Sequence, residues 1–295
     1  MSSPERSVPG QIGPAAADPV RPFSINAQVA ALSFLLGAVY WPMIAFTAAV
    51  VATGDDMAHG LFAPIVAVFI VWQSREKLSA RVGSPSAWGI PVLLVAGMLG
   101  VMASLGSSST FSRVAFLGSL TGAVLVLGGA RLLRAVAFPI ALLLFTFPLP
   151  EVLYAEITLP LQLLASALAE FSLEAIGYSV LREGNILELP NQRLSVVEAC
   201  SGIRSLITLS FLCLVYGYVL EAKVWLRALL FAASIPAAIA TNSLRVTVTA
   251  MLGEVNPEWT NGLAHDSLGW ATLAVGFGLV ILIQVGLVRM LGRRR

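Results

Sequence analysis

The sequence predicts an all-α polytopic membrane protein with about eight transmembrane helices. Hydrophobic residues make up 57% of the 295 residues and charged residues only 12%, whereas soluble domains carry about 25% charged residues. The mean hydropathy is +0.85. Apolar stretches close to the roughly 17–25 residues that cross a bilayer recur along the chain. They lie at about 27–51, 57–73, 88–105, 114–130, 133–149, 203–220, 224–252 and 266–290.

The polar ends of the chain define its expected domain organisation. Residues 1–26 are polar, rich in Pro and Ala, and contain no apolar run, so they do not form a cleaved signal peptide. We expect a flexible cytoplasmic tail over 1–26, a transmembrane domain over 27–291 and a basic cytoplasmic end over 292–295. We find no second soluble domain, no repeat and no nucleotide-binding glycine loop in the sequence.

The charges favour an orientation with both termini in the cytoplasm. With eight spans, 13 of the 18 Lys and Arg residues lie on the cytoplasmic side, as the positive-inside rule requires. Residues 153–181 are apolar but interrupted by Glu156, Glu170 and Glu174, which favours an amphipathic helix at the membrane interface. A ninth span there would move Lys223 and Arg227 outside, so we reject it.

A short segment before the sixth span has the pattern of a hairpin. Residues 185–189 and 194–197 are mainly apolar, and Pro190 and Asn191 lie between them. Pro and Asn are typical turn residues between strands. We therefore predict a small extracytoplasmic hairpin that leads the chain into the sixth span.

Three chemically versatile residues lie at the outer ends of three predicted helices. Cys200 opens the sixth span, Arg245 lies near the outer end of the seventh, and His265 opens the eighth. A helix N-terminus and the nearby Arg204 both stabilise a thiolate, which is the reactive form of cysteine. We interpret Cys200 as a nucleophile, His265 as a general base and acid, and Arg245 as the donor that stabilises an oxyanion.

Several residues have a supporting or an alternative interpretation. Asn242 lies one turn before Arg245 and could orient it, while Glu198 lies close to Cys200 and His59 lies in a predicted outer loop. Taken singly, Arg245 also fits a snorkelling residue and His265 a loop histidine. Cys213 fits a small buried hydrophobe. Neither histidine has a nearby Cys or second His, so we expect no metal site and no cofactor.

The motifs around these residues resemble those of the exosortases, bacterial polytopic proteases and transpeptidases related to the archaeosortases. They comprise Cys-Ser-Gly-x-Arg at 200–204, Asn-Ser-Leu-Arg at 242–245 and His-Asp-Ser-Leu-Gly-Trp at 265–270. Residues 40–42 and 59–64 add an amino-terminal match, with Ala58 where the family more often has Ser. The resemblance runs over roughly residues 35–290.

The resemblance implies a function for the chain. Cys200, Arg245 and His265 match the family's proposed catalytic residues. Family members are thought to cleave carboxy-terminal sorting signals, which combine a Pro-Glu-Pro-like motif, one transmembrane helix and a basic tail. Cleavage is expected at the periplasmic face of the bacterial inner membrane, in connection with extracellular polysaccharide production.

The same resemblance implies the partners of the chain. They are the lipid bilayer and membrane-anchored proteins with such a sorting signal, and no nucleic acid is expected. Some family members carry a further soluble domain after the last span; where this is needed here, we expect a separate accessory protein. We hypothesise that Arg204 or Arg193 pairs with the acidic residue of the sorting motif.

Three other functions remain as alternatives. A transporter would carry ionisable residues or broken helices near the bilayer midplane, and the centres of the third, fourth and sixth spans are free of charge. A non-catalytic membrane subunit of a polysaccharide export system would keep the fold without turnover. A membrane acyltransferase acting on a sugar would use the thiol differently.

Overall fold

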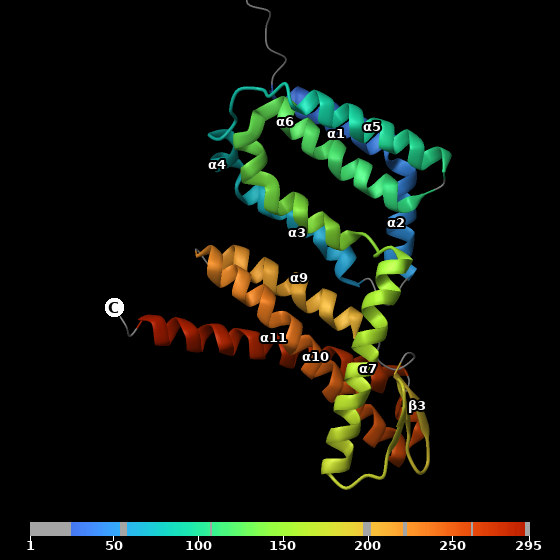
Figure 1. Ribbon diagram of the computed structural model, residues 1–295. Coiled ribbons are helices and arrows are strands. Elements are labelled where there is room, and N and C mark those ends of the chain that lie inside the picture. Colours follow the sequence, from blue (N-terminus) through green and yellow to red (C-terminus); the bar gives the residue numbers. More distant parts are fainter. Residues whose placement is uncertain are drawn as a thin grey trace, which may run out of the picture.

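The computed structural model describes residues 25–53, 58–106, 108–196, 202–220, 223–260 and 262–292. The predicted nucleophile Cys200 and the neighbouring Glu198 lie outside these residues, as do most of the predicted tail and the last three arginines. Figure 1 shows an elongated arrangement of helices with a small sheet at one end.

The amino-terminal half is entirely helical. Its elements are α1 (Ile25–Val39), α2 (Trp41–Thr53), α3 (Ala58–Gln73), α4 (Arg75–Ser79), α5 (Gly89–Leu105), α6 (Ser109–Leu142) and the 3-10 turn η2 (Leu143–Thr146). Figure 1 shows these elements grouped in the upper part of the molecule.

The carboxy-terminal half combines helices with a three-stranded sheet. Its elements are α7 (Glu151–Ala175), β1 (Leu181–Glu183), β2 (Ile186–Glu188), β3 (Arg193–Ser195), α9 (Ile203–Leu220), α10 (Val224–Val255), the 3-10 turn η3 (Pro257–Thr260) and α11 (Gly262–Gly292). Helix α7 runs from the upper group of helices to the sheet (Figure 1).

The structure is that of an all-α membrane protein, but it does not confirm the predicted count of eight spans. Among the described residues, five helices are long and apolar enough to cross a membrane, or six if the bent pair α1–α2 forms one span. Helices α3 and α5 are apolar but shorter. The predicted boundaries fit closely in the carboxy-terminal half, where 203–220 coincides with α9.

The first predicted span, 27–51, is broken into α1 and α2, which meet at an angle of 70°. The break follows from Pro42, the second residue of α2. Proline has no backbone N–H, so it cannot donate to the preceding helical turn. Tyr40, at the bend, donates its backbone N–H to Leu36 and accepts from Ile44.

The predicted spans 114–130 and 133–149 fall largely within α6. At Gly129 the backbone leaves the helical region, with φ of 67° and ψ of −171°, a conformation that only glycine adopts readily. The segment Ser109–Thr146 comprises 38 residues. As one straight helix it would be about 57 Å long, nearly twice the thickness of the hydrocarbon core of the bilayer. The kink at Gly129 therefore lets this segment double back over itself, and Figure 1 shows the two arms.

Residues 153–181, predicted as an interfacial amphipathic helix, fold mostly as a helix in the structure. Most of them belong to α7, a continuous helix of 25 residues that meets the length and composition of a span. The acids lie near its two ends: Glu156 in the second turn, and Glu170 and Glu174 in the last turns. Because the middle of α7 is uncharged, the acids do not prevent it from crossing a membrane. Which side of the membrane the ends of α9, α10 and α11 face therefore stays a prediction.

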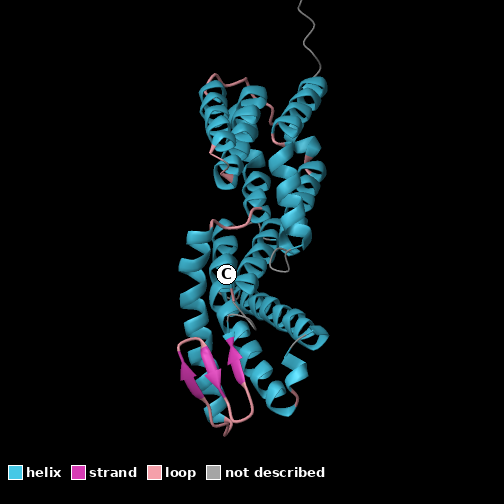
Figure 2. Ribbon diagram, turned by 90° about the vertical axis from the view of Figure 1, so that its right-hand side faces the viewer, coloured by secondary structure: helices cyan, strands magenta, loops and turns pink. Residues whose placement is uncertain are grey.

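An antiparallel sheet lies where the sequence predicted a hairpin, with one strand more than expected. β2 pairs with β3 in the register Leu187 to Leu194, and β1 pairs with the other edge of β2. Figure 2 shows the three strands together at the end of the helices. Leu187 and Leu194 are buried against Val246 of α10. The sheet therefore packs against α10 at Val246, the residue that follows Arg245 in the sequence.

The helices α9, α10 and α11 pack around an apolar core. It contains Leu209 and Cys213 of α9, Leu230 and Ala237 of α10 and Val280 of α11. Cys213 is fully buried there, which confirms its interpretation as a small hydrophobe. This core fixes the three helices that carry the predicted catalytic motifs.

Candidate functional site

Arg245 and His265 meet directly, although they come from different helices. Arg245 of α10 places Nη2 2.6 Å from Nε2 of His265, in the first turns of α11. Arginine has donors but no acceptor, so the imidazole must accept this hydrogen bond. His265 is therefore neutral in this arrangement, with its proton on the other ring nitrogen.

Arg245 keeps donors for a further ligand. Its side chain is 94% buried, with only 6% of the residue exposed, and Nε has no hydrogen-bond partner among the described residues. A neutral imidazole does not compensate the charge of the guanidinium. A buried, incompletely paired cation favours a negative group brought into the site.

Gly269 provides the surface on which the guanidinium rests. A Cβ atom at residue 269 would lie 3.1 Å from Arg245 Nη2 and 3.2 Å from Cζ. Those distances are shorter than ordinary contacts between heavy atoms. Gly269 lies four residues after His265, on the same face of α11. One face of α11 thus carries both His265, which hydrogen-bonds to Arg245, and Gly269, against which the guanidinium packs.

Asn242 lies beside the segment that follows Cys200. Its Nδ2 would lie 3.0 Å from a Cβ at residue 202, where glycine adopts a φ of +75°. Gly202 accepts a hydrogen bond from the backbone N–H of Leu206 in α9. Asn242 and Arg245 lie one turn apart on α10, so one helix contacts both the Cys200 segment and His265.

His59 belongs to a neighbouring cavity and not to the Arg245–His265 pair. It is buried, and its Nδ1 lies 3.2 Å from Oγ1 of Thr208 in α9. His59 and Arg204 line one cavity of about 500 Å³, together with Phe147 and Tyr154. The structure therefore places the two predicted supporting residues on one cavity wall, close to the start of α9.

The two arginines proposed to bind an acidic motif have different surroundings. Arg204 is partly buried and lines the cavity beside His59. Arg193 lies on the sheet, with Nε 3.2 Å from Oε1 of Glu188, its cross-strand neighbour. Because Arg204 lines a cavity that could take a ligand, it is the better candidate for binding an incoming carboxylate.

Arg113 is a further residue of this region, which the sequence alone did not single out. It is buried, and its Nη1 donates to the carbonyl of Pro148 at 3.0 Å. Phe147, Pro148 and Leu149 form part of the cavity wall. Arg113 therefore holds the segment between η2 and α7 in place. Its position directly before the predicted span 114–130 was the available signal.

Within the part of the chain that the structure describes, no three His, Cys, Asp or Glu side chains group in a way that could hold a metal ion. The chemistry that the described residues offer is that of a histidine, a buried guanidinium and a cavity at the start of α9.

Comparison with known proteins gives one match. A family model described as transmembrane exosortase matches residues 51–282, which include Cys200, Arg245 and His265 and cover most of the chain. No curated protein and no solved structure matches the sequence.

Proposed function

Because the chain belongs to the transmembrane exosortase family, we propose that it is a membrane-embedded cysteine protease and transpeptidase. Its substrates are exported proteins that end in a Pro-Glu-Pro-like motif, one transmembrane helix and a basic tail. It cleaves them at the periplasmic face of the bacterial inner membrane, as a step linked to extracellular polysaccharide production. The chain is a multi-pass membrane protein, as its long apolar helices require.

The observation that carries this proposal is the contact between Arg245 and His265. Two helices bring together a buried cation and an imidazole, and Asn242 ties the same region to Gly202, two residues after Cys200. A thiol, an imidazole and a guanidinium are sufficient for acyl transfer. Scattered structural residues have no reason to converge in this way.

In the proposed reaction, Cys200 Sγ forms a bond to the carbonyl carbon of the scissile peptide. His265 takes the thiol proton and later gives it to the leaving amine as the C–N bond breaks. The thioester that remains is released by attack of water or of an acceptor amine, which restores the thiol.

The hydrogen bond between Arg245 and His265 supports an order for these events. Nε2 of His265 is occupied by Arg245 in this structure, so it cannot accept the thiol proton there at the same time. The negative oxygen of the substrate carbonyl is a stronger acceptor than a neutral imidazole. Arg245 would turn to that oxygen as the substrate binds, before the thiol attacks, and would then stabilise the tetrahedral intermediate. This movement frees Nε2 to act as the base.

The cavity next to the start of α9 suits the sorting motif. Its lining is mostly aromatic and aliphatic, and Arg204 is its permanently charged side chain among the described residues. An arginine in apolar surroundings binds a carboxylate strongly. We therefore assign Arg204 to the acidic residue of the motif, with the apolar wall contacting its neighbours.

The test is co-expression with a protein from the same genome that carries the tripartite signal. Wild-type enzyme is expected to shorten this protein on a gel, Cys200→Ala is expected to leave it intact, and the buried Cys213→Ala serves as the thiol control. All variants are quantified in the membrane fraction. Equal processing by Cys200→Ala would remove Cys200 as the nucleophile and with it the proposed mechanism.

A further inference from the structure

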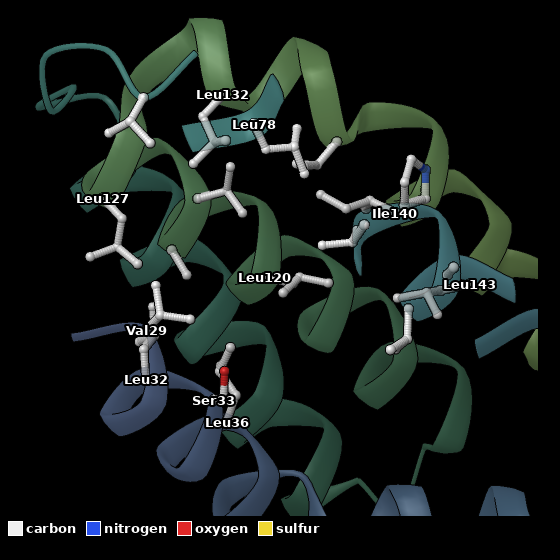
Figure 3. Close-up of a pocket in the computed structure, with 18 residues that line it drawn as sticks. Val29, Leu32, Ser33, Leu36, Leu78, Leu120, Leu127, Leu132, Ile140 and Leu143 are labelled. Atoms are coloured by element: carbon white, nitrogen blue, oxygen red, sulfur yellow. The ribbon is translucent and has the colours of Figure 1, made fainter. Parts of the chain in front are cut away.

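A second cavity lies far along the chain from the catalytic motifs. It has a volume of about 470 Å³ and is lined by α1, α3, α4 and the loop after it, both arms of α6, and η2. Figure 3 shows aliphatic side chains from these elements, including Leu36, Leu120 and Ile140, around the space. Ser33 is the one polar residue among the 18 that line it. Such a cavity takes an apolar ligand.

Cations gather at one end of this cavity. Leu78, Val82 and Leu132 line it, and each directly follows a basic residue in the sequence: Lys77, Arg81 and Arg131. Figure 3 draws Leu78 and Leu132 at the same edge of the cavity.

The backbone keeps this basic end together. The N–H of Gly83 donates to the carbonyl of Gly128 at 3.0 Å, which joins the loop after α4 to the turn in α6. A Cβ at Gly83 would lie 3.5 Å from Cδ of Arg131, so the stem of Arg131 passes along this loop. Lys77, Arg81 and Arg131 therefore lie around one junction.

These three cations are available to a ligand. Lys77, Arg81 and Arg131 are exposed, and none of them forms an ion pair within the described ranges. The neighbouring Arg75 differs, since it donates to the carbonyl of Trp72 and stacks over its ring. Glu76 is the one acid in residues 74–83 and 125–135, against five basic residues.

The size and charge of the cavity identify its occupant. A transmembrane helix about 10 Å wide and 30 Å long occupies roughly 2,400 Å³, so a substrate helix does not fit into about 470 Å³. The basic tail of a substrate would also be repelled by the cations. An acyl chain is narrow and apolar, and an anionic phosphate complements Lys77, Arg81 and Arg131.

We infer that this cavity is a binding site for an anionic phospholipid. One acyl chain occupies the space between α1, α3 and α6, and the phosphate lies against Lys77, Arg81 and Arg131. The lipid ties α1 to the two arms of α6, which stabilises the amino-terminal half of the protein.

The experiment compares two lipids with identical oleoyl chains. The purified full-length chain, in neutral detergent micelles, is titrated with phosphatidylglycerol or phosphatidylcholine, and the melting temperature is followed. Half of the full stabilisation is expected at a mole fraction of phosphatidylglycerol at least tenfold lower than that of phosphatidylcholine. Each cation near a lipid surface contributes about a fivefold gain, so Lys77→Gln/Arg81→Gln is expected to weaken the phosphatidylglycerol effect roughly 30-fold.

The matched control is Lys223→Gln/Arg289→Gln, which removes one Lys and one Arg from exposed positions on other helices. It is expected to keep the wild-type preference. Val124→Phe, which fills the cavity from α6, is expected to abolish stabilisation by both lipids. Equal stabilisation by the two lipids would overturn the inference. So would an unchanged preference in Lys77→Gln/Arg81→Gln, or an equal loss in the control.

Discussion

Gly269→Ala tests whether the position of the Arg245 guanidinium controls the reaction. The added methyl would lie 3.1 Å from Nη2 and 3.2 Å from Cζ of Arg245. Ordinary contacts begin near 3.5 Å, so the guanidinium must move by about 0.4 Å. It is the end of a flexible side chain, and the backbone of α11 need not change. The substitution therefore displaces one group in an otherwise intact protein.

The expected loss of activity follows from this displacement. A misplacement of 1 Å costs about 100-fold in rate, and complete removal of one oxyanion donor costs about 100- to 1,000-fold. A displacement of about 0.4 Å is therefore expected to slow processing by roughly tenfold. The thermal stability is not expected to fall, because replacing Gly with Ala inside a helix is favourable by about 1 kcal/mol.

The assay is the rate of shortening of the co-expressed substrate, normalised to the enzyme in the membrane fraction. Gly278→Ala is the matched control, since it lies on the same helix and no described heavy atom comes within 4 Å of the added methyl. It is expected to process at the wild-type rate. If Gly269→Ala also processed at the wild-type rate, the guanidinium position would not matter and the assigned role of Arg245 would be wrong.

Three further predictions concern residues around the start of α9. Gly202→Ala is expected to lower stability and processing more than Gly177→Ala, because both have a positive φ but only the former meets Asn242; thermal melts and the processing assay distinguish them. Cys213→Ala is expected to destabilise the protein by about 1 kcal/mol and to keep full specific activity, because the thiol is buried among apolar side chains; a melt with a matched rate measurement checks this. Arg204→Glu is expected to slow processing roughly 10- to 100-fold, since a charged hydrogen bond is lost, and a substrate whose acidic motif residue is changed to Lys is expected to recover part of the rate. An unimproved rate with that substrate would contradict the assigned pairing.

The helices that were predicted well are those whose limits are set by local chemistry. Residues 203–220 are mainly apolar and follow Gly202, and α9 has the same limits. By contrast, the bend between α1 and α2 depends on the angle that Pro42 imposes, which an apolar run of residues does not reveal. The reversal of α6 at Gly129 depends on one positive φ.

The membrane topology was harder to predict because residues 153–181 fit both an interfacial helix and a transmembrane helix. The acids of α7 suggested an interfacial helix, but they lie near its ends. Glu170 is paired with Arg182 at 2.6 Å, next to the sheet. An ion pair makes a carboxylate near a membrane less unfavourable than an unpaired one. The pairing of Glu170 with Arg182 depends on the position of β1, which the sequence did not predict.

The candidate site was predictable as a set of residues and not as an arrangement. Motifs on separate helices pointed to Arg245 and His265, but their contact depends on how α10 packs on α11. The support from Gly269 was missed, although its position four residues after His265 was a usable signal. His59 lines a cavity together with Arg204, a placement that the sequence did not predict.

The most direct test of the central claim is detection of the thioester between Cys200 and its substrate. Enzyme and substrate are co-expressed, trapped by rapid acid denaturation and resolved on a gel with and without hydroxylamine, which cleaves thioesters. A hydroxylamine-sensitive adduct is expected with the wild type and with Cys213→Ala, and none with Cys200→Ala. An adduct that persisted in Cys200→Ala would contradict the proposal that Cys200, served by His265 and Arg245, is the nucleophile.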